Sequence, residues 1–181
     1  FMEDTNTMIE GSIAKKIIYF AIPLFLGNLF QQLYNTADSL IVGNFLGSSA
    51  LAAVASSGNL IFLLVGFFNG LSVGAGVVIA RFFGAHDHRR VRLSIHTTVA
   101  LGIICGLVLT GVGVIFAPKI LVLMGTPQDV LPDSIIYFRI YFMGSLAFVL
   151  YNAFTGILQA LGDSKHPLYY LIISSVINVV L

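Results

Sequence analysis

Charged residues are scarce in this sequence. Asp, Glu, Lys and Arg make up 9% of it, whereas hydrophobic residues make up 57%. An ordinary water-soluble domain contains about 25% charged residues. A soluble fold with so few charges would leave large apolar areas in contact with water, whereas a lipid bilayer accommodates them. The composition therefore excludes an ordinary soluble domain and predicts an integral membrane protein.

Cysteine occurs once, as Cys105, which excludes an internal disulfide and a cysteine-based metal site. HExxH is absent and no cluster of metal ligands lies on a predicted span, so the chain is not expected to be an enzyme or to hold a cofactor. His86, Asp87 and His88 are residue types that bind metals, but they share a basic loop without further ligands, so no metal site is expected. The sequence also lacks a long basic run with interleaved aromatics, and nucleic acid is not an expected partner.

Long apolar runs are abundant. In lipid they are expected to form α-helices, because lipid offers no hydrogen-bonding partner to an open backbone. The expected fold is an all-α polytopic bundle with about five transmembrane helices, separated by turns rich in Gly, Ser, Asn and Pro such as GNFLGSS. The predicted spans cover residues 17–42, 50–80, 93–117, 134–161 and 167–181.

The last of these runs is short. Its 15 residues give about 22 Å of helix, against roughly 30 Å for the hydrocarbon core of a bilayer. The chain is therefore expected to end inside a helix and to be a fragment of a longer protein.

Positive charge is unevenly distributed among the predicted loops. Arg81, Arg89, Arg90 and Arg92 lie in the second loop, and the first loop has no Lys or Arg. The positive-inside rule then predicts a multi-pass protein of the cell membrane with a cytoplasmic N-terminus and with this loop on the same side.

Glycines recur every four residues in two predicted spans. Gly66, Gly70 and Gly74 share one face of the second span, and Gly102 and Gly106 repeat the spacing in the third. Small residues at this spacing allow close approach of helices in lipid. The pattern favours helix packing over a ligand pathway.

One carboxylate, Asp38, lies in the first span, and no other Asp, Glu, Lys or Arg occurs between Lys16 and Arg81. An ionised aspartate near the membrane centre costs about 2.5–3.5 kcal/mol on insertion scales. Its position near the C-terminal end of a helix adds an unfavourable dipole interaction of up to about 1 kcal/mol. Both effects favour the protonated carboxyl. Such a group is suited to exchange a proton or small cation for a cationic ligand.

Asp38 belongs to a polar stripe with Asn28, Gln31 and Asn35, all within an arc of about 80° on a helical wheel. Unpaired polar groups against acyl chains cost several kcal/mol, so the stripe is expected to face other helices or a hydrated cavity. Three interpretations of Asp38 remain open. It is a coupling site for transport, an interfacial residue in water at the outer surface, or an architectural ion-pair partner of Arg139.

A proline and three further polar residues accompany the stripe. Pro23 lies inside the first span, where it removes one backbone hydrogen bond and predicts either a static kink or a functional bend. Tyr137, Asn152 and Asn178 lie in the fourth and fifth spans and are candidates to meet the stripe, although lone polar residues in spans more often bond neighbouring helices.

The segment AIPLFLGNLFQQLYNTADSLIVGNFLGSSALAAV, residues 21–54, resembles the multidrug and toxic-compound extrusion family, the MATE transporters. The likeness includes the spacing between the proline and the acid of the first span. A second stretch, FTGILQALGDSKHP at 154–167, is similar to the end of the family's fourth span. The resemblance covers essentially the whole chain, as the first four and a half spans of a twelve-span protein.

The resemblance implies two six-helix lobes around a central cavity, with residues 1–181 forming part of the N-terminal lobe. It also implies antiport that exports organic cations or drugs in exchange for H⁺ or Na⁺, with the lipid bilayer and the missing lobe as partners. Asp38 matches the family's acidic cation-coupling residue, Asn178 a polar position near it, and Pro23 a proline whose bending is linked to protonation in some members. The residues expected to be polar groups of the substrate cavity are Gln31, Tyr34, Asn35, Tyr137 and Asn152.

This sequence departs from the family in one respect: a second acid that often follows the asparagine of the fifth span would fall beyond Leu181. Two other functions remain as alternatives. A flippase of lipid-linked saccharides shares the superfamily architecture but lines its cavity with several basic residues, whereas these spans offer only Arg139. A structural membrane subunit would keep the polar stripe fully buried and dry.

Overall fold

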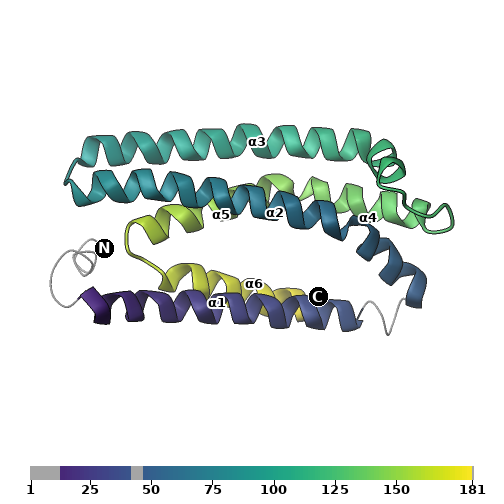
Figure 1. Ribbon diagram of the computed structural model, residues 1–181, viewed down its shortest axis with the longest axis horizontal. Helices are drawn as coiled ribbons and strands as arrows, with labels where there is room; N and C mark the ends of the chain where they lie inside the picture. Colours follow the sequence, from purple (N-terminus) through teal and green to yellow (C-terminus); the bar gives the residue numbers. More distant parts are fainter. Residues whose placement is uncertain (1–12, 42–46, 181) are drawn as a thin grey trace.

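The computed structural model describes residues 13–41 and 47–180, which are almost entirely helical and contain no strand. The predicted all-α class is therefore confirmed. The helices are α1 (Ile13–Ile41), α2 (Gly47–Gly84), α3 (His88–Leu123), α4 (Leu131–Met143), α5 (Ser145–Ala160) and α6 (Lys165–Val180), shown in Figure 1.

Three segments are long and apolar enough to cross a membrane: Ala14–Ala37, Leu60–Gly84 and His88–Leu123. The bent pair α4 and α5 supplies a fourth candidate. The helix α6 has 16 residues, which is short for a complete span. Large apolar side chains cover the outside of the long helices. Phe62 of α2, for example, is 80% exposed. This outward apolar surface is what a helix needs in contact with lipid.

The fourth predicted span differs from the structure. The residues predicted as one span at 134–161 form two helices, which meet at Gly144 with a bend of 45°. The Gly144 N–H bonds the Tyr141 carbonyl at 3.1 Å, so the last turn of α4 tightens before α5 begins. Hydropathy is continuous across this glycine, so the apolar pattern gave no sign of the break.

The helix α2 extends beyond both ends of the span predicted at 50–80. The helix α2 begins at Gly47, inside the turn expected at 43–49. At its other end, α2 and α3 extend into the basic loop expected at 81–92, and only residues 85–87 separate them. Arg81, Arg89, Arg90 and Arg92 are consequently helical residues.

The helices form two groups. The larger group is a bundle of α2, α3, α4 and α5, and α1 packs along α6 beside it (Figure 1). One apolar cluster joins α3 to α4 through Leu121, Phe138 and Phe142, with the two phenylalanine rings stacked at 4.4 Å. A second cluster, of Ile79, Val91 and Ile157, joins α2, α3 and α5.

Small residues allow the bundle helices to approach closely. A Cβ added at Gly106 of α3 would lie 2.8 Å from the Cα of Leu146 on α5, and one added at Gly102 would lie 3.4 Å from a methyl group of Leu150. The packing predicted for these two glycines is thus confirmed. A similar crossing joins α2 to α5, where a Cβ at Gly76 would lie 3.3 Å from the Gly156 carbonyl oxygen.

The glycines of α2 at 66, 70 and 74 behave differently. They are exposed, and nothing in the described part of the chain lies within 4 Å of a Cβ added at any of them. The packing predicted for this glycine face is therefore not provided by the described helices and stays a prediction.

Two helix ends explain the sharp turns of the bundle. Gly125 after α3 and Gly162 after α5 have φ values of 75° and 90°, which glycine adopts without a Cβ clash. Each closes a Schellman motif; the second has Gly162 N–H bonded to Gln159 O at 3.0 Å and Asp163 N–H bonded to Leu158 O at 2.9 Å. The Asp163 carboxylate then accepts the backbone N–H groups of Lys165 and His166, each at 3.1 Å, and starts α6.

Candidate functional site

The helix α1 carries most of the predicted site. It continues through Pro23, which is buried and leaves one carbonyl of the preceding turn without its helical partner. The side chains of the two predicted coupling residues, Asp38 and Asn178, lie outside the described residues. Their positions in the site therefore follow from the helix backbones alone.

The backbones of α1 and α6 bring these two positions to a similar level. The helices run in the same direction (Figure 1), and a Cβ added at Gly27 would lie 3.8 Å from Leu171 and 3.9 Å from Leu168. From this contact, Asp38 lies about 16 Å further along α1, and Asn178 lies roughly 10–15 Å further along α6. The packing of α1 on α6 thus places positions 38 and 178 at a similar height along the two helices, as a coupling site formed by both residues requires.

The amides of the polar stripe are exposed. Gln31 and Asn35 lie on the described surface, and the Asn35 Nδ2 group donates to Gln32 Oε1 at 3.5 Å. Tyr34, one turn before Asp38, is half-buried. On a helical wheel the stripe lies about 20–100° from Gly27, the residue of α1 that packs on α6. It therefore borders the α1–α6 contact and presents amides beside apolar side chains.

Tyr137 and Asn152 lie in the other group of helices. Among the described residues, α1 makes its extensive contact with α6 and none comparable with α2, α3, α4 or α5. The Asn152 Nδ2 group donates to Phe148 O at 2.9 Å within α5, and its backbone carbonyl accepts the hydroxyl of Ser72 on α2. The ring of Tyr137 is half-buried on α4, 6.5 Å from the ring of Tyr141. The structure therefore does not bring these two residues against the stripe.

Arg139 has a backbone partner that the sequence analysis missed. Its Nε donates to the Val114 carbonyl oxygen at 3.2 Å. That carbonyl is the one left open by Pro118, which lies four residues later in α3 and has no N–H. The signal was available only in part. Arg139 is the one Lys or Arg within the predicted spans, but Pro118 lies just beyond the span predicted at 93–117, where the loss of its N–H was not expected to matter.

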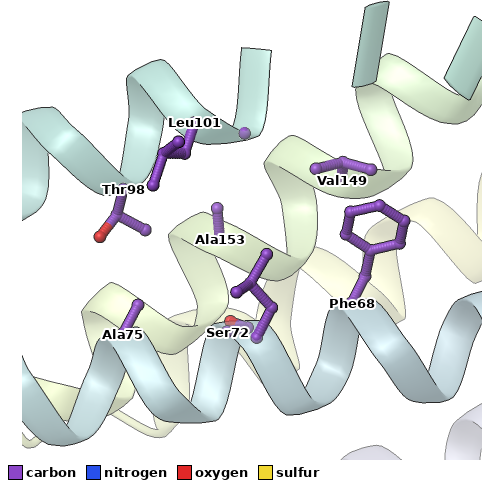
Figure 2. Close-up of a pocket in the computed structure, with 9 residues that line it drawn as sticks. Phe68, Ser72, Ala75, Thr98, Leu101, Val149 and Ala153 are labelled. Carbon is purple, nitrogen blue, oxygen red and sulfur yellow. The ribbon is translucent and has the colours of Figure 1, made fainter. Parts of the chain in front are cut away.

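A small hollow lies between α2, α3 and α5 (Figure 2). Its volume is about 60 Å³, and none of the predicted site residues lines it. Drug-sized ligands occupy pockets of roughly 300–1,000 Å³, so this hollow is a packing space in the bundle and not a substrate cavity. The lining includes Phe68, Ser72, Ala75, Thr98, Leu101, Val149 and Ala153.

A family model described as MatE matches residues 23–181, which include α2 to α6 and most of α1. The chain belongs to the MatE family. The predicted family is therefore confirmed, and MatE proteins are membrane transporters and not enzymes in general.

Among curated proteins, the probable multidrug resistance protein YoeA of Bacillus subtilis is 39% identical over 177 residues. That alignment covers 98% of this chain and 38% of YoeA. Crystal structures of MATE in the bent and in the straight conformation each match with a TM-score of 0.90 and 28% identity, covering all of this chain and 40% of theirs. The likeness therefore concerns a helix arrangement common to both conformations. This chain spans about two-fifths of the length of these MatE proteins.

Proposed function

We propose that the full-length protein is a secondary active antiporter of the cell membrane that exports organic cations in exchange for H⁺ or Na⁺. This chain supplies most of its N-terminal lobe, with the N-terminus in the cytoplasm. The observation that supports the proposal best is the exposed position of Gln31 and Asn35 on a membrane-length apolar helix. Amides do not face acyl chains, so such a stripe fits a hydrated cavity closed by a second lobe.

In the proposed mechanism, Asp38 is the group that changes charge. Its ionised carboxylate attracts a cationic substrate from the cavity, and binding of H⁺ or Na⁺ removes the charge that held the substrate. The asparagine at 178, at a similar level on α6, adds a neutral oxygen ligand for the coupling ion. A ligand drives a change between inward-facing and outward-facing states only by its difference in affinity for the two, and the binding of H⁺ or Na⁺ at Asp38 supplies that difference.

Pro23 is the proposed hinge of α1, and Gln31, Tyr34 and Asn35 are the proposed polar groups of the cavity on this helix. Tyr137 and Asn152 are less well supported as polar groups of the cavity. The side-chain amide of Asn152 already donates to the Phe148 carbonyl oxygen. They would join the cavity only where the second lobe closes over α4 and α5.

Two observations favour the exporter over its alternatives. A flippase needs free cations in the cavity for pyrophosphate, whereas Arg139 donates to the Val114 carbonyl. A structural subunit would keep the polar stripe buried, whereas Gln31 and Asn35 are exposed in the described chain.

The experiment that tests the proposal is efflux of a fluorescent organic cation from vesicles containing the full-length protein, driven by a proton or a sodium gradient. Asp38→Asn removes the titratable group and keeps the side-chain size. We expect it to lower efflux at least 100-fold, the loss of about 2.7 kcal/mol of coupling, while the amount of folded protein is unchanged. The control is Asp129→Asn, which neutralises an exposed aspartate between α3 and α4 and should leave efflux intact. Normal export by Asp38→Asn would refute the proposed coupling site.

A further inference from the structure

The basic residues of the chain gather at one end of the helix bundle. Of its nine Lys and Arg residues, two lie at other places, Lys119 in α3 and Arg139 in α4. The start of α1, the turn between α2 and α3, and the turn between α5 and α6 all lie at the same end (Figure 1). We call this end the basic end. Its basic residues are Lys15, Lys16, Arg81, Arg89, Arg90, Arg92 and Lys165.

The described carboxylates of this end do not neutralise it. Asp87 pairs with Arg90 at 3.3 Å, and Asp163 pairs with His166. Among the described residues, no carboxylate within 4 Å pairs with any basic residue of this end other than Arg90. The two aspartates also cap α3 and α6, so the helix N-termini are occupied as well. In the part of the chain that the structure describes, the basic end thus carries seven basic side chains against two carboxylates, Asp87 and Asp163.

The side chains are arranged as at a membrane surface. Arg81, Arg89, Arg92 and Lys165 are exposed, and they lie at the ends of apolar, membrane-length helices or beside them. Aromatic side chains stand within about one turn of the lysines. Tyr19 is 75% exposed, and Tyr169 and Tyr170 flank the ring of His166. Tyrosines beside basic residues are typical of the layer where lipid headgroups meet water. The chemistry that complements both features is an anionic phosphate held above acyl chains.

We propose that the basic end is a docking surface for anionic phospholipid headgroups and that it selects them over zwitterionic lipids. Each basic residue near an anionic membrane surface strengthens attraction by about 1 kcal/mol, a factor of about five. Arginines supply bidentate contacts to phosphate oxygens, and the tyrosines hold the lipid at the depth of the headgroup. The proposal concerns lipid selection and does not depend on the transport reaction.

The test is native mass spectrometry of the full-length protein in a neutral detergent, titrated with phosphatidylglycerol or with phosphatidylcholine. We expect the unmodified protein to bind phosphatidylglycerol at least tenfold more tightly, with the preference decreasing as salt is added. The variant Arg81→Gln/Arg89→Gln/Arg92→Gln should weaken phosphatidylglycerol binding about 100-fold and leave phosphatidylcholine binding unchanged. Equal affinity of the unmodified protein for both lipids would overturn the proposal.

A matched pair of lysines provides the control for position. Lys165→Gln and Lys119→Gln each remove one exposed lysine, the first from the basic end and the second from α3 far along the bundle. We expect about a fivefold loss of phosphatidylglycerol affinity for Lys165→Gln alone. Equal losses in the two variants would overturn the proposal. The variant Arg81→Lys/Arg89→Lys/Arg92→Lys keeps the charge and should keep the preference, which separates loss of binding from loss of folding.

Competition with two other phosphate compounds tests whether the basic end recognises a lipid or any phosphate. Glycerol phosphate carries the headgroup charge without acyl chains, and a short oligonucleotide carries many phosphates. We expect both to displace phosphatidylglycerol only at concentrations at least 100-fold higher than the lipid itself. Displacement by glycerol phosphate at concentrations similar to the lipid would show a site for free phosphates, and equal displacement by the oligonucleotide would show a general polyanion surface. Either result would overturn a lipid docking site.

Discussion

At the scale of single residues, the contact between Arg139 and the Val114 carbonyl shows how a membrane helix tolerates an internal proline. Pro118 removes the N–H that would have bonded this carbonyl, and lipid offers no water to replace it. The Arg139 Nε group donates instead, at 3.2 Å. One side chain on α4 thereby satisfies a backbone group on α3, which also fixes how these two helices lie against each other.

This contact predicts a specific pattern of coupling between Arg139 and Pro118. Arg139→Met should lower the free energy of unfolding by about 1–3 kcal/mol, because the Val114 carbonyl loses its donor in an apolar environment. In a Pro118→Ala background the same substitution should have almost no effect, because the substituted alanine provides its own N–H to that carbonyl. The measurement is a double-mutant cycle on the full-length protein, by the fraction that remains monodisperse after heating. Equal losses in both backgrounds would mean that Arg139 stabilises the fold by some other contact.

At the scale of helices, the glycines of α3 differ in what surrounds them. Gly106→Ala places a Cβ 2.8 Å from the Cα of Leu146, which is backbone and has little room to move. We expect a loss of about 1–3 kcal/mol through overpacking against α5. The control is Gly111→Ala on the same helix, where nothing in the described chain lies within 4 Å of the new methyl group. This control should be neutral or raise stability by up to about 1 kcal/mol, since alanine is the better helix former. Both glycine variants are measured by the same heating assay as the Arg139 variants. A larger loss of stability for Gly111→Ala than for Gly106→Ala would show that α3 and α5 do not cross at Gly106.

The sequence predicted the helices better than it predicted their ends and breaks. Long apolar runs allow only helices in lipid, so the class and the approximate spans followed from composition. The break at Gly144 did not, because apolar residues continue on both sides and a glycine inside a span also occurs in unbroken helices, as at Gly106 and Gly113 of α3. The helical course of Arg89 and Arg92 was missed for a related reason. Charged residues mark where a helix leaves the lipid, and the helix itself continues into water.

The candidate site was predictable in part. The stripe of Gln31, Asn35 and Asp38 follows from helical periodicity alone. The separation of Asn152 from that stripe does not, because periodicity within one helix carries no information about which other helix it meets. The position of Asn152 became clear only from the close crossing of α2 and α5 at Gly156.

At the scale of the whole molecule, the pairing of α1 with α6 links the two ends of the chain. Residues 42–164, which include α2 to α5, lie between these two helices in sequence, so the chain forms the bundle before α6 packs against α1. A pairing of this kind depends on complementary shape, here Gly27 against Leu168 and Leu171, and hydropathy does not report it. It also determines the proposed coupling site, since it brings the level of Asn178 on α6 to that of Asp38 on α1.

The pairing predicts a cross-link between the first and last helices. In a Cys105→Ala background, which removes the one native thiol, Gly27→Cys and Leu171→Cys should be joined by a short bis-maleimide, because a Cβ at Gly27 lies 3.8 Å from the Leu171 side chain. The control pair is Gly27→Cys with Leu150→Cys on α5, which should stay unlinked because the described α1 has no comparable packing against α5. The protein is cleaved between the two sites after the reaction, and linked fragments are resolved by electrophoresis. Linkage of the control pair alone would place α1 against the bundle and separate Asp38 from Asn178. Asp38 would then have to exchange its coupling ion without the asparagine, and Asn178→Ala should leave efflux intact.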